Sequence, residues 1–273
     1  MIKRIYLEIT NRCNLRCSFC AFHHREMKEM TLEEIRSILP MLKEVTDYLY
    51  LHVQGEPLLH SRFTDILEVL DQEGFKVQLV TNGTLLPKYI DMIMAHPCIR
   101  KLAISLQSID QHSNNELEEF IPQFLAYLKH HDHPYVELRF WAKEALGPRA
   151  KRIDSWLNST YSFEETSRPN SYLIDDKVFV HYDSLFAWPA LNDQNNTSGT
   201  CHGGRDMIAI LSNGTVVPCC LDAEGVIELG NIFTTPLRDI LSSSRYLNMF
   251  EGFKRNELTE PLCRSCTYRH RFD

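Results

Sequence analysis

Cysteines are the residues of this chain whose type and spacing most clearly allow chemistry, and the chain has nine of them. Cys13, Cys17 and Cys20 lie near the N-terminus, separated by three and two residues. An odd count in a chain that we expect to be cytoplasmic disfavours a disulfide framework and favours metal-binding or catalytic thiols. Three thiolates on one short segment suit an iron–sulfur cluster and leave its fourth iron open to a substrate or cofactor. Zinc suits this segment less well, because it prefers closely spaced pairs and a fourth protein ligand.

A second group of cysteines lies near the C-terminus. Cys201, Cys219, Cys263 and Cys266 supply four thiolates, and only two residues separate the last pair. In this interpretation Cys220 is not a ligand. The alternative is that Cys220 takes the place of Cys219 as a ligand. Four thiolates with such a pair suit either a complete iron–sulfur cluster or a structural zinc ion, and the residue types leave both open.

Strand-like and helix-like segments alternate between the two cysteine groups. Strands are predicted at residues 5–9, 48–53, 77–81, 102–106, 136–141 and 178–182. The first helix opens with a capping box of Thr31 and Glu34, and the second ends near Gly74. Repeated alternation of strand and helix predicts a parallel α/β fold. Cys13 follows the first strand, at the edge where parallel sheets place their sites.

The predicted strands alternate between apolar and polar positions, which is unusual for parallel strands covered by helices on both faces. A curved sheet with a polar cavity on its concave face explains the alternation better than a sheet with one wet face. We expect His52, Glu137 and His181 to supply donors and acceptors for a substrate in that cavity. The polar positions are Tyr6, Glu8, Tyr50, His52, Gln54, Gln78, Asn82, Ser105, Gln107, Glu137, Arg139, Trp141 and His181.

The N-terminal motifs resemble those of the radical S-adenosylmethionine (radical SAM) superfamily. The first cysteine group, with Phe19 just before Cys20, is similar to the signature of that superfamily. The segment 54–59, Gln-Gly-Glu-Pro-Leu-Leu, resembles its GGEPLL motif with Gln54 in place of the first glycine. The segments 81–83 and 104–106 end the third and fourth predicted strands, where the superfamily often contacts its cofactor.

The resemblance implies a partial (β/α)6 barrel that holds a [4Fe–4S] cluster on Cys13, Cys17 and Cys20. S-adenosylmethionine (SAM) would chelate the open iron and be cleaved reductively to a 5′-deoxyadenosyl radical. Arg139 would meet the methionine carboxylate or, equally well, pair with Glu137. The residues expected around the cofactor are Phe19, Gln54, Gly55, Glu56, Asn82, Ser105, Gln107 and Arg139.

The C-terminal cysteines resemble the SPASM and Twitch extensions of radical SAM enzymes. The resemblance implies one auxiliary [4Fe–4S] cluster on Cys201, Cys219, Cys263 and Cys266, with zinc as the alternative. A hairpin turned at Asn213-Gly214 and a helix over 237–250 are expected in this extension. We therefore predict a core domain at 1–190 and an auxiliary-cluster domain at 191–273.

Composition narrows the possible partners. Hydrophobic residues make up 44% and charged residues 24% of 273 residues, as in a globular chain without membrane spans. No signal segment opens the sequence, so we expect a cytoplasmic protein. A net charge of −7 argues against a nucleic acid as the main partner. The expected partners are a small-molecule substrate and a low-potential electron donor such as flavodoxin or ferredoxin.

The leading functional hypothesis is a radical SAM enzyme that abstracts hydrogen from a small, polar, ring-containing molecule. A dehydrogenase and a lyase acting on a 7-deazaguanine base, similar to the queuine lyases, are both compatible with it. A peptide maturase is less favoured, because only one predicted strand precedes Cys13 and leaves no room there for a peptide-recognition domain. A non-catalytic metal-binding scaffold is the remaining alternative.

Overall fold

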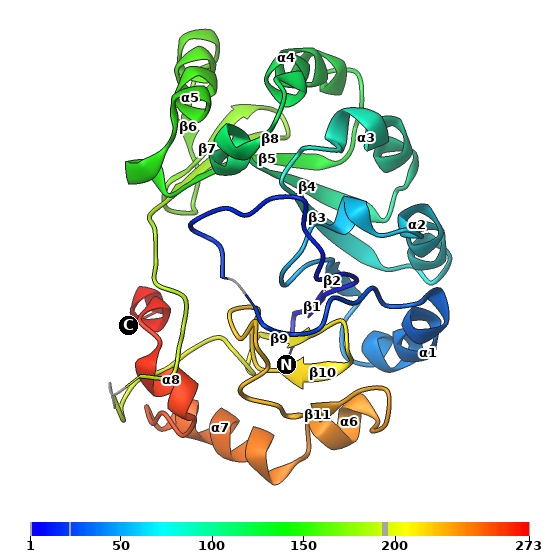
Figure 1. Ribbon diagram of the computed structural model, residues 1–273, viewed down its shortest axis with the longest axis vertical. Helices are drawn as coiled ribbons and strands as arrows, with labels where there is room; N and C mark the ends of the chain where they lie inside the picture. The colour runs from blue at the N-terminus through cyan, green and yellow to red at the C-terminus, as the bar shows by residue number, and fades with distance from the viewer. Residues whose placement is uncertain (1, 22, 193–195, 273) are drawn as a thin grey trace.

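The computed structural model describes residues 2–21, 23–192 and 196–272, so four residues of the expected C-terminal domain, 193–195 and 273, lie outside the described part. These described residues form one curved sheet of eleven strands, flanked by helices (Figure 1). In spatial order the strands are β11 (Gly230–Asn231), β10 (Thr215–Val217), β9 (Met207–Ile210), β1 (Arg4–Leu7), β2 (Tyr48–Tyr50), β3 (Lys76–Thr81), β4 (Ile99–Ser105), β5 (Tyr135–Trp141), β8 (Val178–Asp183), β7 (Ser171–Asp175) and β6 (Glu164–Glu165).

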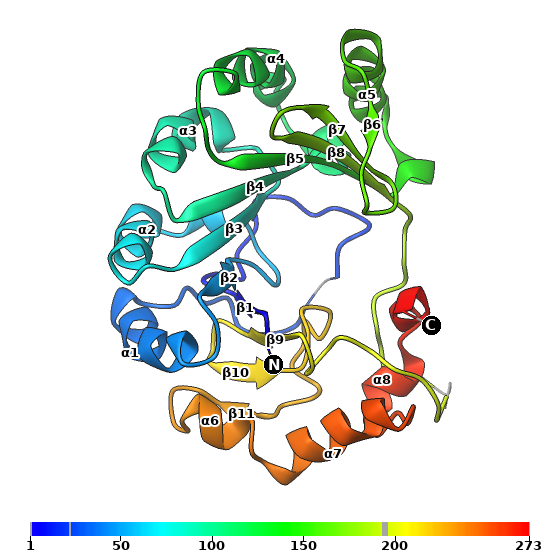
Figure 2. The ribbon, with the colours of Figure 1, turned by 180° about the vertical axis from the view of Figure 1, so that it is seen from behind.

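The six predicted strands are all present and lie side by side in parallel, in the order β1-β2-β3-β4-β5-β8. Helices cover their outer side, as both ribbon views show (Figures 1 and 2). The sheet does not close, because its two ends are β11 and β6. The predicted α/β fold with a partial barrel is confirmed. The helices are α1 (Leu32–Lys43), α2 (Phe63–Gln72), α3 (Leu86–Ala95), α4 (Glu116–Leu128) and α5 (Pro148–Thr160).

Local sequence signals set the limits of the first two helices. Thr31 caps α1: its side chain accepts from the backbone N–H of Glu34, whose carboxylate accepts from the backbone N–H of Thr31. The helix α2 is followed by Gly74 at φ +66°, a left-handed conformation that favours glycine. Both predicted helix boundaries are confirmed.

Side chains of alternating parity separate the core from the concave face. Along β5, Val136, Leu138 and Phe140 are fully buried on the helix side. The intervening Arg139 and Trp141 line the concave side. This is the predicted polar parity of a curved sheet, and it places a polar surface inside the arc of strands.

The predicted C-terminal hairpin is present and continues the main sheet. Strand β9 pairs in parallel with β1 and antiparallel with β10. The single helix expected over 237–250 is wrong: α6 (Leu237–Ile240) and α7 (Ser244–Lys254) replace it. Ser243 is extended between them, and its side chain caps α7 by accepting from the backbone N–H of Tyr246. A last short helix, α8 (Pro261–Ser265), carries Cys263.

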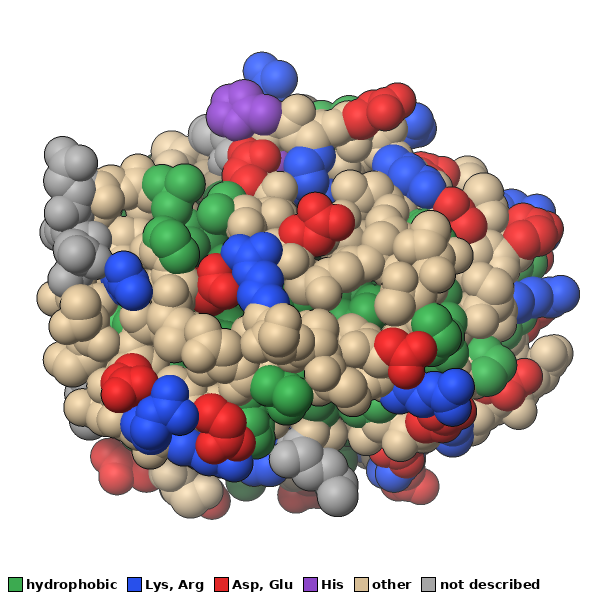
Figure 3. All heavy atoms as spheres, turned by 90° about the horizontal axis from the view of Figure 1, so that it is seen from below, with side chains coloured by type: hydrophobic (Ala, Val, Ile, Leu, Met, Phe, Trp, Pro, Cys, Tyr) green, Lys and Arg blue, Asp and Glu red, His purple; other side chains and the backbone are tan. Residues whose placement is uncertain are grey.

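In the described part of the chain, no helix is both long and apolar enough to cross a bilayer. Figure 3 shows the face that lies below the view of Figure 1, with acidic and basic side chains interspersed over it. This face does not present the uniform basic surface on which nucleic-acid binding depends.

Candidate active site

A cavity of about 750 Å³ lies on the concave side of the sheet, and both cysteine groups line it. Glu137 and His181 are not among its lining residues, and they are 1% and 5% exposed. The other residues predicted to bind metal, cofactor or substrate line it, namely Cys13, Cys17, Phe19, Cys20, His52, Gln54, Gly55, Glu56, Asn82, Ser105, Gln107, Arg139, Cys201, Cys219, Cys263 and Cys266.

The segment between β1 and α1 carries the first three cysteines. Asn11, near the start of this segment, forms hydrogen bonds to residues near its end. The Asn11 amide donates to the carbonyl of Glu26 over 2.8 Å, and its oxygen accepts from the backbone N–H of Lys28 over 2.8 Å. Asn11 is only 2% exposed, so these bonds form away from water. They hold the two arms of the cysteine segment together.

Gly55 allows the loop after β2 to approach the cysteine segment. Its φ is +80°, and a Cβ there would lie 2.4 Å from the carbonyl oxygen of Thr10 and 2.9 Å from that of Arg12. The next residue, Glu56, donates its backbone N–H to the Arg12 carbonyl over 2.8 Å. Both the left-handed backbone and the close contact therefore require glycine.

Glu56 links the loops that follow β2 and β3. Its carboxylate accepts from the Thr81 hydroxyl and from the Asn82 backbone N–H, each over 2.7 Å. Burial raises the pKa of Glu56 to about 7, against the opposing effect of these hydrogen bonds. The Asn82 side chain then donates to the Asn14 amide oxygen over 2.9 Å, which ties the same loop to the cysteine segment.

The three N-terminal thiols lie near one another and beside Gln54. Burial, and then the neighbouring Cys20 and Cys13 thiols, raise the pKa of Cys17 to about 12. The Cys20 thiol lies 3.3 Å from Gln54 Oε1, and the buried Gln54 Nε2 has no partner among the described residues. Closely spaced thiols whose ionisation is unfavourable need a cation to hold them as thiolates, as a metal cluster does.

Cys219 and Cys220 are neighbours in the sequence, but their side chains have different surroundings. A Cβ at Gly203 would lie 3.2 Å from Cys219 Cβ and 3.7 Å from Cys201 Sγ, so these two cysteines flank one glycine. Burial, and then the charges of Cys220, Cys201 and Cys263, raise the pKa of Cys219. Cys220 lines the cavity too, but it packs with Tyr6 against a small apolar cluster of the sheet.

Within the described residues, no three His, Cys, Asp or Glu side chains converge closely enough to hold a single metal ion. The cysteine groups are thus recognised by their shared cavity and their mutual electrostatic influence.

An ion pair missed by the sequence analysis joins the cysteine segment to the C-terminal part of the chain. Arg25 donates to both carboxylate oxygens of Glu8, over 2.7 and 2.8 Å, and Glu8 is fully buried. Glu8 also accepts from the backbone N–H groups of Gln54 and Ser212, and Arg25 donates to the carbonyl of Ala223. The pair therefore connects β1, the cysteine segment and the C-terminal hairpin.

Glu137 lies in an ionic network behind the cavity wall. It accepts from Arg139 over 2.6 Å, from Arg168 over 3.2 Å and from Lys101. Burial acts to raise its pKa, but Arg139 and Lys101 outweigh burial and lower the pKa to about 2. Glu137 is therefore ionised at neutral pH and makes a poor proton acceptor.

The two histidine candidates are neutral at pH 7. Burial, and then Arg139, lower the pKa of His52 to about 3, while burial and Arg168 lower that of His181 to about 4. His181 Nδ1 accepts from the indole N–H of Trp141 over 3.3 Å. His52 lines the cavity, and its buried Nδ1 has no partner among the described residues.

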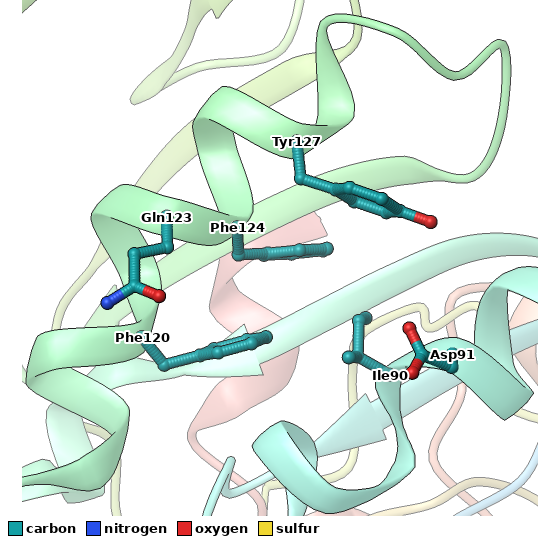
Figure 4. A pocket seen from close by; sticks show the side chains of 6 residues that line it. All are labelled: Ile90, Asp91, Phe120, Gln123, Phe124 and Tyr127. Carbon is teal, nitrogen blue, oxygen red and sulfur yellow. The ribbon is translucent and has the colours of Figure 1, made fainter.

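A second, smaller hollow of about 170 Å³ lies on the outer side of the sheet, between α3 and α4. Figure 4 shows the rings of Phe120 and Phe124 facing Ile90 and Asp91 across it. The two rings are stacked with centroids 5.4 Å apart. Its lining contains neither a cysteine nor a polar strand position, so the large cavity is the candidate active site.

Two protein families match the segments that carry the two cysteine groups. The family model of the radical SAM superfamily matches residues 7–137, and that of an iron–sulfur cluster-binding domain, SPASM, matches residues 201–267. The chain therefore carries a radical SAM domain followed by a SPASM-type cluster-binding domain. The second match begins at Cys201 and ends one residue after Cys266.

Two curated relatives resemble the N-terminal part. A tungsten-containing aldehyde ferredoxin oxidoreductase cofactor-modifying protein of Pyrococcus furiosus is 39% identical over 89 residues, 31% of this chain. An S-adenosylmethionine-dependent nucleotide dehydratase of Selenomonas ruminantium is 33% identical over 88 residues, 32% of this chain. The matched segments span only 25% and 32% of these relatives.

Solved structures match the whole fold at low identity. BtrN in complex with AdoMet and 2-DOIA superimposes with a TM-score of 0.65 at 17% identity, covering 98% of this chain and 93% of that one. Streptococcus suis SuiB bound to precursor peptide SuiA gives a TM-score of 0.61 at 14% identity, covering 97% and 71%. These similarities establish the architecture.

The two domains imply a [4Fe–4S] cluster with SAM and an auxiliary iron–sulfur cluster. The residues fit these groups, because soft thiolate ligands of both groups line one cavity. The unpartnered Gln54 Nε2, on a side chain only 5% exposed, adds a donor for a group held there.

Proposed function

We propose that this protein is a radical SAM enzyme that abstracts hydrogen from a small, polar, ring-containing molecule bound in the cavity. The observation that carries the proposal is the convergence of both cysteine groups and most of the polar strand positions on one cavity. When bound, the cluster and SAM supply reductive cleavage of SAM and hydrogen abstraction by the resulting radical, with electrons from a flavodoxin or ferredoxin.

The residues of the chain divide the remaining work. Cys13, Cys17 and Cys20 hold the cluster, while Gly55 and Asn82 keep the adjoining loops against the cysteine segment. Ser105 and Gln107, which line the cavity at the end of β4, supply hydrogen-bonding groups for the cofactor.

The proposal is tested by anaerobic incubation with SAM and a reduced flavodoxin or ferredoxin. We expect slow release of 5′-deoxyadenosine without substrate and faster release with a low-molecular-mass metabolite fraction. The product then separates the two candidate reactions: a dehydrogenase yields a molecule with two hydrogens fewer, whereas a lyase acting on a 7-deazaguanine base yields two fragments. Failure of the intact holoprotein to cleave SAM would instead support a non-catalytic scaffold.

A peptide maturase is the second candidate function. It is favoured by the fold similarity to SuiB, whose structure contains a precursor peptide, and by the open edge of the sheet. If only a peptide fraction accelerated 5′-deoxyadenosine release, this alternative would replace the small-molecule proposal.

We propose Cys219, and not Cys220, as the fourth ligand of the auxiliary cluster, because Cys219 flanks Gly203 together with Cys201. Cys219→Ala should lower the iron content of the reconstituted protein from about eight to about four atoms per chain. Cys220→Ala is the matched control and should keep about eight. Iron and zinc are measured together by mass spectrometry of the purified protein. Equal iron loss in both variants would contradict the assignment, and one zinc per wild-type chain would favour the structural-zinc alternative.

A further inference from the structure

Four of the six Lys and Arg residues that line the cavity come from four separate parts of the sheet and its connections. Arg4 comes from β1, Lys101 from β4, Arg139 from β5 and Arg168 from the segment before β7. The charges of the three arginines, opposed by that of Glu137, act on the Tyr50 hydroxyl, which also faces the cavity. Lys101 contacts the same carboxylate, Glu137, as Arg139 and Arg168, so the four side chains lie around one region of the cavity.

Carboxylates balance this charge only in part. Glu137 is the shared partner of Lys101, Arg139 and Arg168, so one negative charge stands against three positive ones. None of the ion pairs found in the described part of the chain includes Arg4, and its buried Nε has no hydrogen-bond partner there. The guanidinium of Arg4 lies 5.8 Å from the centroid of the Tyr50 ring.

The other carboxylates that line the cavity have partners of their own. Asp183 accepts from Arg271 over 2.7 Å, and Asp222 accepts from the backbone N–H groups of Val226 and Ile227. The Glu56 carboxylate accepts from the backbone N–H of Leu58 in its own loop. It also accepts from Thr81 and Asn82, at the end of β3. The positive excess around Tyr50 thus remains uncompensated by the described protein groups.

We propose that this region binds an oxyanion group of the substrate, a phosphate or a carboxylate, between Arg4, Arg139 and Arg168. The inference rests on the proposed function and names the chemical class of its substrate. Guanidinium groups present parallel N–H donors that match the oxygens of phosphate and carboxylate. Partly buried cations without a counter-charge are costly, and a bound anion removes that cost.

Arg168→Gln and Arg4→Gln test the proposal in the reconstituted holoprotein. Arg168 is suited to this because its side chain is 50% exposed, so its removal leaves the core intact. Arg152→Gln is the matched control: Arg152 is 59% exposed and pairs with Glu118, on the outer side of the fold. Isothermal titration with tripolyphosphate and with citrate provides a phosphate and a carboxylate probe at low ionic strength.

We expect each test variant to bind one of the two probes about tenfold more weakly than the wild type does, because a charge-assisted hydrogen bond is lost. The Arg152→Gln control should bind that probe as tightly as the wild type. The tighter-binding probe identifies the anion class: tripolyphosphate indicates a phosphorylated substrate and citrate a carboxylated one. Absence of binding to both probes, or equal weakening in Arg152→Gln, would overturn the inference.

SAM itself carries a carboxylate, so its affinity is measured on the same variants. We expect the dissociation constant of SAM to be the same in Arg168→Gln and in the wild type. A tenfold loss of SAM affinity would show that the cations serve the cofactor and would overturn the assignment to the substrate. If polyanions bind as expected but the wild type does not cleave SAM, the proposed function fails and the anion site stands.

Discussion

Replacing Cys13, Cys17 and Cys20 together by alanine should abolish reductive cleavage of SAM. The three thiols line the cavity beside Gln54, and no described residue replaces them as soft ligands at that position. The variant should keep about four iron atoms per chain on the C-terminal cysteines. Release of 5′-deoxyadenosine under anaerobic reducing conditions measures the loss, and iron analysis shows that the second group is still loaded.

Cys98→Ala is the control for this triple variant. Cys98 is buried at 5% exposure, but it packs near Leu67 in the outer core and does not line the cavity. Its replacement should leave both iron content and SAM cleavage unchanged, at a modest cost in stability. Continued SAM cleavage by the triple variant would show that these cysteines do not hold the catalytic cluster.

Local signals in the sequence were sufficient to predict much of the fold. The capping box of Thr31 and Glu34 and the left-handed Gly74 depend only on neighbouring residues, and both have the expected geometry. The polar parity of the strands also predicted the concave cavity, because alternation along a strand sorts side chains onto two faces. Short-range patterns therefore gave the elements and the lining of the site.

Contacts between distant segments could not be predicted in the same way. Nothing next to Arg25 in the sequence indicates that it pairs with the buried Glu8, or that Glu8 also reaches Ser212. Pairing of Glu137 with Arg139, two residues further along β5, was one of the two roles expected for Arg139. The other cationic partners of Glu137, Lys101 and Arg168, come from separate segments and help to hold it behind the cavity wall. The pairing of β9 with β1 is likewise a property of the folded chain.

Gly55→Ala should impair SAM cleavage by at least tenfold, because it separates the loop after β2 from the cysteine segment. A methyl group at this position would lie 2.4 Å from the Thr10 carbonyl oxygen, and the φ of +80° adds strain of about 1–3 kcal/mol. To relieve the contact, the backbone must move, which disrupts the 2.8 Å bond from Glu56 N–H to the Arg12 carbonyl. Urea unfolding and initial rates of 5′-deoxyadenosine release measure the two effects.

Gly74→Ala separates backbone strain from the close contact. Gly74 has a similar φ of +66°, but an added Cβ would meet only Lys43 Nζ, at 3.6 Å, an ordinary contact. This variant should lose about 1 kcal/mol of unfolding free energy and retain wild-type SAM cleavage. Since both variants carry left-handed strain, a selective loss of cleavage in Gly55→Ala isolates the approach of its loop to the cysteine segment. Equal cleavage rates in the two variants would show that this approach is not needed for the reaction.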